Sequence, residues 1–529
     1  MTRHRVIIWV SLFLLLCFAL FVRSYHISSI PSGLYPDEAV NAIDAIGAIE
    51  SGHYQLFYPN NYGREGLFIN LQALALKTFG YTVAALKFWS IIFGTLTVLG
   101  IYLLGKEVLR RRGAALLSAF FVATSYWTIN FSRIGFRAIM TAFLMSFAFY
   151  FLFRGLRTRK FIDFALSGFL IGLGLHTYIS FRLTPLILVV LLPFLMLSYE
   201  NFLKRYWKHG LTFALFAFIA AAPMLYHFFI AHPEDFASRS AAVSIFSPEV
   251  NKGDFLGTFT KTLGLSLIKY NFWGDQNWRH NYPPYPILDP ITGFFFLGAF
   301  LFLISQTITL LGRRLRHKDR DIRLVRNAFL LSSFFIMLMP EFLTAEGLPH
   351  ALRAVGTQVP VFLMAGLGAF WIYRKIEHSR TQTKMIFLSL FVMALTLSAG
   401  FNLTKYFIFF AESPTQRDAF NEDYTNMARY LLSLPPETKK YIFANAGGTD
   451  INNGLPVTAQ SLYFLTYGKI QNLIFLTPDT VITAPGVIIL MRYDENIVKR
   501  ILERNPNALL KPIYANPNSD VFFNAIILP

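Results

Sequence analysis

Apolar stretches close to the ~20 residues that a helix needs to cross a bilayer recur along the first 400 residues of the chain. Short polar segments separate them, and a stretch of this length and composition is typical of a membrane-spanning helix. The pattern predicts eleven spans, at residues 6–22, 83–104, 114–130, 138–153, 161–178, 182–199, 210–230, 287–311, 328–345, 351–373 and 385–401. We therefore expect an all-α polytopic membrane domain.

The basic residues provide an independent test of this topology, because cytoplasmic loops carry an excess of Lys and Arg. With a cytoplasmic N-terminus, every inner loop is a dense basic cluster, at residues 106–112, 154–160, 204–208, 313–326 and 374–384. The short loops on the other side hold one or two basic residues each. This alternation favours an odd number of spans in a multi-pass protein of the plasma (inner) membrane, with its C-terminal part outside the cytoplasm.

Three longer segments fall on the predicted outer face, at residues 23–82, 231–286 and 402–529. In the last of them, helix-like stretches alternate with short strand-like ones, which is typical of a small α/β domain. We expect helices at 418–434, 459–466 and 495–504, and strands at 440–444, 473–476 and 487–492. The predicted organisation is a membrane domain over residues 1–401, including the first two outer loops, and a soluble α/β domain over 402–529.

Composition supports this class of protein: 54% of the residues are hydrophobic, 17% aromatic and only 15% charged. The net charge of +18 could indicate a nucleic-acid partner, but the basic residues lie in the loops between apolar stretches, where they act as topology signals. We therefore expect the lipid bilayer as a partner, and no nucleic acid. The single cysteine, Cys17, lies within the first span, so no intramolecular disulfide is possible.

Candidate chemistry begins with two adjacent carboxylates, Asp37 and Glu38, shortly after the first span. The order Pro36-Asp37-Glu38 also suits the start of a helix, where the dipole favours carboxylates. A capping role and a catalytic role are compatible. Other acids, histidines and arginines gather at the outer ends of the spans, in contrast to the plain Lys/Arg clusters inside, and could form one wall of a site.

Several motifs together resemble the GT-C glycosyltransferases, over about residues 1–400. They are the Asp37-Glu38 pair after the first helix, the later Gly63-Arg64-Glu65-Gly66-Leu67-Phe68, the segment Gly274-Asp275-Gln276-Asn277-Trp278-Arg279-His280-Asn281 with Pro286-Ile287-Leu288-Asp289, and Pro349-His350-Ala351-Leu352-Arg353. The dolichyl-phosphate-mannose protein mannosyltransferases and their bacterial relatives, the aminoarabinose and galacturonic acid transferases, look most similar.

The resemblance implies transfer of a hexose or pentose from a polyprenyl-phosphate donor to a glycan, lipid or protein acceptor at the outer face, with inversion at the anomeric carbon of the sugar. It implies Asp37 as general base and Glu38 as a second acid that orients the acceptor or the base. Arginine suits the donor phosphate because its planar fork forms paired, charge-assisted bonds. We expect the phosphate on Arg353, His350, Arg279, Arg182 and Arg137, and the acceptor or sugar on Glu65, Arg64, Tyr178, Asp275 and Trp278.

A divalent metal cation is a further possibility, with Glu65 and His280 as ligands, since Glu65 matches a metal-binding acid of the aminoarabinose transferases. Those relatives have Lys-Pro after this acid, whereas this chain has Gly66-Leu67. No other cofactor is expected.

Two alternative functions stay open from the sequence. A transporter or flippase for lipid-linked sugars would need ionisable groups near the middle of the bilayer, whereas here they gather at the outer ends of the spans. A polymerase or ligase for such sugars would place its main outer loop late in the chain, whereas here the early loop carries the acids.

The second outer loop also contains four aromatic residues, Trp273, Trp278, Tyr282 and Tyr285. They fit either an interfacial belt or a surface on which a sugar ring stacks.

Overall fold

The computed structural model describes residues 3–237, 243–477, 480, 482, 484–514 and 521–529. The chain forms two compact units, each built from several segments. The helical unit comprises Met1–Tyr25, Glu65–Phe68 and Trp89–Phe410, and the mixed unit comprises His26–Arg64, Ile69–Phe88 and Ala411–Pro529.

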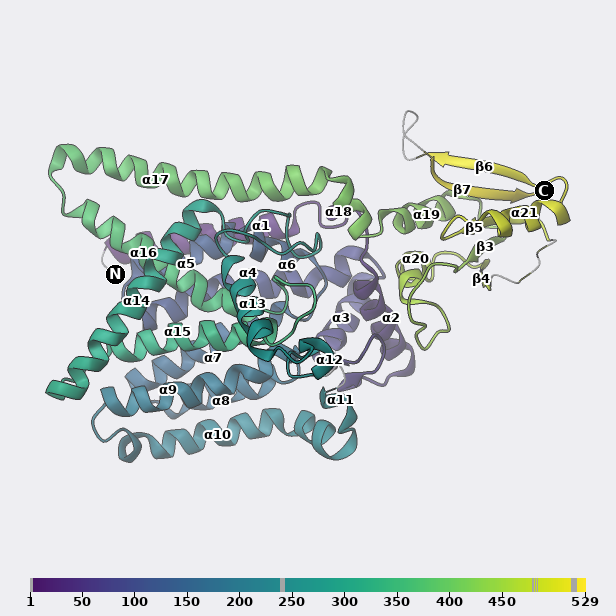
Figure 1. Ribbon diagram of the computed structural model, residues 1–529. Coiled ribbons are helices and arrows are strands. Elements are labelled where there is room, and N and C mark those ends of the chain that lie inside the picture. The colour runs from purple at the N-terminus through teal and green to yellow at the C-terminus, as the bar shows by residue number, and fades with distance from the viewer. Residues whose placement is uncertain (1–2, 238–242, 478–479, 481, 483, 515–520) are drawn as a thin grey trace. The chain divides into compact units, whose positions relative to one another are not determined.

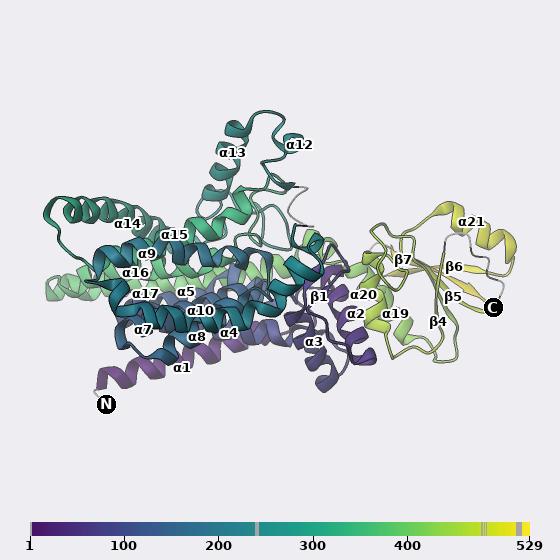
Figure 2. The ribbon, with the colours of Figure 1, turned by 90° about the horizontal axis from the view of Figure 1, so that it is seen from below.

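Nine helices of the described residues are long and apolar enough to cross a membrane. They are α1 (Arg3–Ser24), α4 (Val83–Val108), α7 (Ile139–Thr158), α9 (Thr184–Ser198) with the preceding turn η1 (Ile179–Leu183), α10 (Phe202–Tyr226) with η2 (His227–Ala231), α14 (Pro290–His317), α15 (Arg323–Phe342), α16 (Gln358–Glu377) with η4 (Val355–Thr357), and α17 (Thr381–Thr404) with η5 (Lys405–Phe410). Figures 1 and 2 show them as long rods packed along one another. The chain is a multi-pass membrane protein, as the sequence predicts.

The other two predicted spans have a different form. The span expected at 114–130 is a bent pair, α5 (Arg112–Thr124) and α6 (Tyr126–Arg133), which meet at 55°. Ser125 between them has an extended backbone, with φ −65° and ψ 133°, and this residue breaks the helix. The span expected at 161–178 is α8 (Phe161–Gly174), whose 14 residues extend about 21 Å, short of the ~30 Å hydrocarbon core.

Helix α8 is held between α7 and α10, and the three lie side by side in Figure 1. Gly168 and Gly172 permit the close approach to α10: a Cβ atom at these positions would lie 2.1 Å from the Phe213 oxygen and 2.2 Å from the Ala217 oxygen. Small residues four apart are a common means of bringing two membrane helices into backbone contact.

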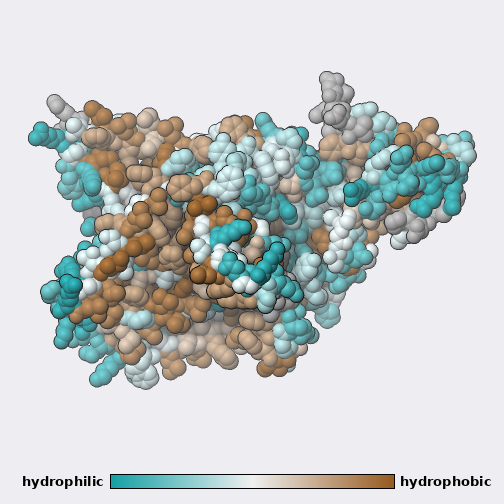
Figure 3. Space-filling model, viewed as in Figure 1, coloured by the Kyte–Doolittle hydropathy of each residue, from teal (hydrophilic) through white to brown (hydrophobic). Residues whose placement is uncertain are grey.

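The outside of the helical unit is largely apolar. Figure 3 shows hydrophobic side chains over the length of the helices and hydrophilic ones gathered at their ends. Helix α10, for example, exposes Leu211, Leu215, Phe218 and Ile219. In water this surface would be unfavourable, and in a bilayer it is the expected lipid-facing surface.

The mixed unit contains a five-stranded sheet with the order β4-β3-β5-β7-β6. Strand β3 (Lys440–Phe443) is parallel to β4 (Leu473–Leu476) and β5 (Gly486–Leu490), whereas β7 (Val521–Leu528) is antiparallel to β5 and to β6 (Leu509–Tyr514). The same unit contains the helices α19 (Glu422–Ser433), α20 (Gln460–Thr466) and α21 (Glu495–Arg504). The small α/β domain predicted near the C-terminus is present.

Side chains alternate between the two faces of this sheet, as the pleat requires. Ile442 and Ile489 pack with Met427 and Leu431 of α19, together with Leu462. Their neighbours Tyr441, Phe443 and Ile488 pack on the other face with Ile497 and Ile501 of α21. The result is a three-layer arrangement, with α19 and α20 on one face and α21 on the other.

The early loop packs with the C-terminal part of the chain in the mixed unit, whereas the sequence assigned it to the membrane domain. Helix α2 (Pro36–Ser51) and the later part of α3 (Gly66–Phe79) share a hydrophobic cluster with Phe464 of α20. The Ser461 hydroxyl also donates to the Leu34 carbonyl at 2.7 Å. Apolar residues of the early loop are thus buried by the tail as well as by one another.

The remaining elements are short connections: β1 (Phe57–Tyr58), which pairs with β2 (Arg64–Glu65), α11 (Glu234–Ala237), α12 (Pro248–Asn251), α13 (Phe255–Ile268), α18 (Pro414–Ala419) and η6 (Val457–Ala459).

Candidate active site

The two adjacent carboxylates lie in the first turn of α2. This helix begins at Pro36, whose fixed φ suits the first helical position, and Tyr35 before it has an extended backbone. Asp37 and Glu38 therefore meet the positive end of the helix dipole. Consecutive helical residues point about 100° apart, so the two side chains enter different surroundings.

Glu38 is completely buried, and its Oε2 lies 3.6 Å from Nζ of the equally buried Lys87. Asp37 is half-buried, and its Oδ1 accepts a hydrogen bond from Nδ2 of Asn61 at 2.9 Å. Its Oδ2 takes no hydrogen bond from any side chain or backbone group in the described part of the chain. Of the two acids, only Asp37 is partly exposed, so its Oδ2 is the oxygen that an acceptor hydroxyl could reach.

Asn61, which donates the hydrogen bond to Asp37, lies in a tight turn. Asn61, Tyr62 and Gly63 all have left-handed backbones, with φ values of 52°, 65° and 81°. Glycine suits the last position because a Cβ atom there would lie 2.4 Å from the Phe57 ring. The turn directs the Asn61 amide at the carboxylate and leaves the Tyr62 ring 68% exposed.

A buried polar network supports this turn. Arg64 is 2% exposed and forms an ion pair with Asp44, a hydrogen bond to Asn41 Oδ1, and a 3.1 Å hydrogen bond to the Asn60 carbonyl. Asn60 also donates to Asp44 at 2.7 Å. Burial raises the pKa of Asp44, and Arg64 and Asn60 oppose this shift. Arg64, expected to contact the sugar, is instead enclosed in the protein interior because its guanidinium neutralises Asp44.

A second group of predicted residues meets in the helical unit. Glu65 Oε2 accepts from Arg137 Nε at 2.9 Å, and Glu65 Oε1 accepts from Arg182 Nη2 at 3.0 Å. The Arg137 guanidinium also lies over the Tyr178 ring, 5.4 Å from its centroid. The structure thus brings four predicted residues together, with two positive charges on one carboxylate.

Arg182 also lines a cavity of about 350 Å³ together with Tyr178 and Arg353. Much of the remaining wall is apolar, with Leu183, Phe246, Met339, Pro340 and Leu343 among its residues. Arg353 is held by Glu346 at 2.9 Å and by Thr344 at 2.7 Å. Arg182 Nε and Ser180 Oγ are buried and have no hydrogen-bond partner among the described residues. Arginines in an apolar cavity form a suitable site for a phosphate attached to a lipid chain.

Two histidines and an acid form a third group. His280 Nδ1 lies 3.2 Å from Asp275 Oδ2, and the rings of His280 and His350 are 4.8 Å apart. Burial, together with the nearby positive charges, lowers the pKa of His350 well below its usual value, so this ring is neutral at pH 7. Asp275 is 1% exposed and accepts from the Ala351 amide at 2.6 Å. Asp275, expected to contact the sugar, therefore joins two loops.

The ligand atoms of Asp275, His280 and His350 lie within 4.8 Å of one another, as a divalent cation would require. The surroundings do not fit one. Asp275 already accepts N–H groups on both oxygens, from Asn277 at 2.8 Å and from Ala351. Positive charges surround His350. The expected ligand Glu65 is likewise occupied by two arginines, whose charges oppose a cation.

We therefore expect that removing divalent cations leaves activity unchanged. A chelator such as EDTA, added to the purified protein and then dialysed away, should lower the activity by less than about twofold, because the candidate ligands have protein partners. Loss of activity that Mn²⁺ or Mg²⁺ restores would contradict this prediction.

The last two predicted residues lie on the same loop as Asp275. Arg279 is half-buried, and its Nε donates to Asn277 Oδ1 at 3.1 Å. Trp278 is half-buried and packs edge-on against Tyr282, with ring centroids 5.0 Å apart. They are thus held by neighbours on the loop itself.

Three lysines that are buried in or beside apolar helices were not predicted from the sequence. Lys87 accompanies Glu38, and Lys405 contacts the Pro286 carbonyl at 3.2 Å. Lys269 forms an ion pair with Glu341, and both side chains are 0% exposed. Glu341 also accepts from the His350 amide at 2.9 Å. The signal for all three is a single lysine in or directly beside an apolar helix, away from the basic loops.

Comparison with known proteins gives the following similarities. Residues 67–227 match the family of dolichyl-phosphate-mannose-protein mannosyltransferases. ArnT from Cupriavidus metallidurans bound to undecaprenyl phosphate superposes with a TM-score of 0.53 at 12% identity, over 98% of this chain and 97% of ArnT. The apo oligosaccharyltransferase from Archaeoglobus fulgidus gives 0.52 at 14% identity, over 96% of this chain and 69% of that one. Comparison with curated protein sequences finds no match.

These similarities define the class of protein. The chain has the GT-C fold, which it shares with ArnT over nearly the full length of both chains. Residues 67–227 in addition match the mannosyltransferase family, so glycosyl transfer is the general kind of activity to consider for a chain with this fold.

Proposed function

We propose that the protein transfers a sugar from a polyprenyl-phosphate donor to an acceptor hydroxyl at the extracytoplasmic face of the plasma membrane, with Asp37 as the general base. The observation that carries the proposal is the contrast between the two acids at the start of α2. Glu38 is buried against Lys87, whereas Asp37 has one oxygen fixed by Asn61 and the other available. ArnT bound to undecaprenyl phosphate supports the class of donor.

The proposed step needs a base for the acceptor and cations for the leaving group. The acceptor hydroxyl gives its proton to Asp37 Oδ2 while its oxygen forms a bond to the anomeric carbon. The bond between that carbon and the phosphate oxygen breaks, and polyprenyl phosphate leaves. Attack opposite to the leaving group inverts the anomeric carbon. Glu38, paired with Lys87, acts indirectly by fixing the first turn of α2.

Arg182 and Arg353 are the phosphate-binding residues in this proposal. Both line the same largely apolar cavity, and Glu65 and Glu346 hold their guanidinium groups in place. Arg137 shares Glu65 with Arg182 and positions it. A guanidinium offers a phosphate two parallel N–H groups, which lysine cannot reproduce.

We expect Arg182→Lys and Arg353→Lys each to lower transfer about 10- to 100-fold, because each loses a charge-assisted bond worth about 1.5–3 kcal/mol. The loss should include a higher KM for the lipid-linked donor. Arg313→Lys is the matched control, because Arg313 is exposed and pairs with Asp319. Equal effects of all three substitutions would contradict the proposed roles.

Mass spectrometry of surface glycans, glycolipids and glycoproteins tests the proposed function. Cells producing the protein should carry at least one sugar increment that is missing both from cells lacking it and from cells producing Asp37→Asn. Identical glycan profiles in the three strains would overturn the proposal. The mass of the increment identifies a hexose or a pentose.

A further inference from the structure

A cavity of about 760 Å³ lies at the end of the helical bundle away from Glu65, Arg137 and Arg182. Helices α7 and α9 both begin near those residues and run to the cavity, and α15 runs in the opposite direction. A 20-residue helix is ~30 Å long, so this cavity is separate from the candidate active site. Its volume is within the range of ligand-binding pockets, about 300–1,000 Å³.

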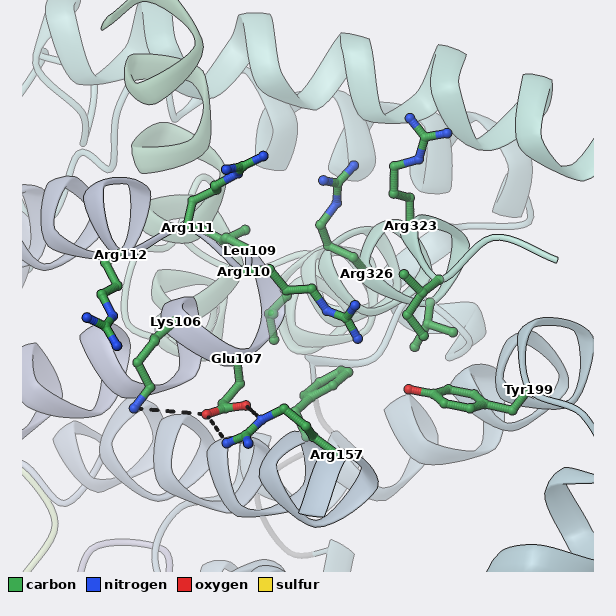
Figure 4. A pocket seen from close by; sticks show the side chains of 14 residues that line it. Lys106, Glu107, Leu109, Arg110, Arg111, Arg112, Arg157, Tyr199, Arg323 and Arg326 are labelled. Atoms are coloured by element: carbon green, nitrogen blue, oxygen red, sulfur yellow. Dashed lines mark hydrogen bonds and ion pairs between the residues drawn. The ribbon is translucent and has the colours of Figure 1, made fainter. Parts of the chain in front are cut away.

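The cavity is strongly basic. Seven Lys and Arg side chains and one carboxylate, Glu107, line it, and they come from the ends of α4, α5, α7 and α15. Figure 4 shows the guanidinium group of Arg110 directed at the space between Arg157 and Tyr199. Three separate segments of the chain, residues 106–112, 157 and 323–326, therefore bring positive charge to one cavity, which a set of loop charges serving only as topology signals does not require.

Much of this charge is not neutralised. Glu107 pairs with Arg157 at 2.7 Å and lies 4.0 Å from Lys106, and Arg323 pairs with Asp321 outside the cavity. Arg110, Arg111 and Arg112 form no ion pair with an acidic residue in the described ranges, and all three are exposed. Three consecutive guanidinium groups are available to an anion.

An adjoining cavity of about 570 Å³ is lined by the same three arginines. Beyond them its wall is mainly apolar, with Ile7, Leu116, Leu117, Phe370 and Phe391 from α1, α5, α16 and α17, and its other charged residues, Arg374 and Glu377, form an ion pair at 2.8 Å. Arg110, Arg111 and Arg112 thus stand between a basic space and an apolar one. A soluble phosphate would occupy only the basic cavity. A phospholipid could place its headgroup in the basic cavity and an acyl chain in the apolar one.

We propose that the two cavities together bind an anionic phospholipid, with the headgroup phosphate on Arg110, Arg111 and Arg112 and an acyl chain against the apolar wall. Basic pockets between membrane helices are known to suit anionic headgroups, and arginine forms paired bonds with phosphate. The bound lipid would connect α1, α5, α7, α15 and α16 at this end of the bundle.

Native mass spectrometry of the full-length, delipidated protein tests this, with phosphatidylglycerol and phosphatidylcholine of identical acyl chains as probes. Phosphatidylglycerol should bind more tightly than phosphatidylcholine. The variant Arg110→Gln/Arg111→Gln/Arg112→Gln should bind phosphatidylglycerol on the order of a hundredfold more weakly, since each charge near a headgroup contributes about a factor of five. The control Lys204→Gln/Lys208→Gln/Arg316→Gln loses the same charge from exposed positions outside both cavities, and should bind normally.

A measurement on the unmodified protein covers the case in which the triple variant fails to fold. Phosphatidylglycerol should raise the unfolding temperature, because a ligand that binds only the folded state stabilises it. Phosphatidylcholine and inorganic phosphate should not. Equal weakening in both triple variants, or equal stabilisation by inorganic phosphate, would overturn the proposal.

Discussion

Asp37→Asn is expected to lower sugar transfer by on the order of a thousandfold, because a general base contributes about 10²–10⁴ to the rate. The amide keeps the shape of the carboxylate but cannot accept the proton of the acceptor hydroxyl. Donor binding should be little changed, so the loss should fall on kcat. Transfer by the purified protein, measured with a labelled lipid-linked sugar, gives the rate.

Two further substitutions show whether this loss is specific. Asn61→Ala should lower transfer less, by about tenfold, since it removes only the hydrogen bond of about 1.5 kcal/mol that orients Asp37. Asp418→Asn, at an exposed position in the same unit, should have no effect. Near-normal transfer by Asp37→Asn, in protein that inserts and elutes normally, would remove Asp37 as the base.

Breaking the buried pair of Lys269 and Glu341 should produce the largest loss of stability. Lys269→Met leaves the fully buried Glu341 without its counter-charge, and breaking a buried pair in this way typically costs about 3–5 kcal/mol of folding free energy. Glu341 also holds the amide of His350, so the loop that carries Arg353 should loosen as well. Thermal unfolding in detergent measures the effect.

The double variant Lys269→Met/Glu341→Leu is the informative control. It removes both charges and fills the site with apolar side chains, so it should be more stable than Lys269→Met alone. If the double variant is less stable than the single one, the pair contributes through its geometry and not through charge balance. The cost that we assign to an isolated buried charge would then be wrong.

Much of the membrane domain could be predicted from the sequence because the signals there are local. Apolar length predicts a span wherever twenty such residues follow one another. It does not predict the break at Ser125, which depends on the packing of α6, or the shortness of α8. Strands β6 and β7 were not predicted. Pro512 lies within β6, and it is tolerated there because β6 is at the edge of the sheet.

In the candidate site, too, some features follow from neighbouring residues in the sequence and others depend on residues far away along the chain. The position of Asp37 at the start of a helix follows from Pro36 beside it. The difference between Asp37 and Glu38 depends on Asn61 and Lys87, which are 24 and 49 residues away along the chain from their partners. Arg64 was expected to contact the acceptor or the sugar, and its burial depends on its distant partner Asp44.

The shared hydrophobic cluster of α2, α3 and α20 affects the order in which the protein can be completed. Leu34 and Ala45 are synthesised early, but Phe464, which covers them, emerges after every membrane span has been made. Until then the helix that bears Asp37 has an open apolar side. A chain that ended after α17 would keep all its spans and still lack the finished surroundings of its proposed base.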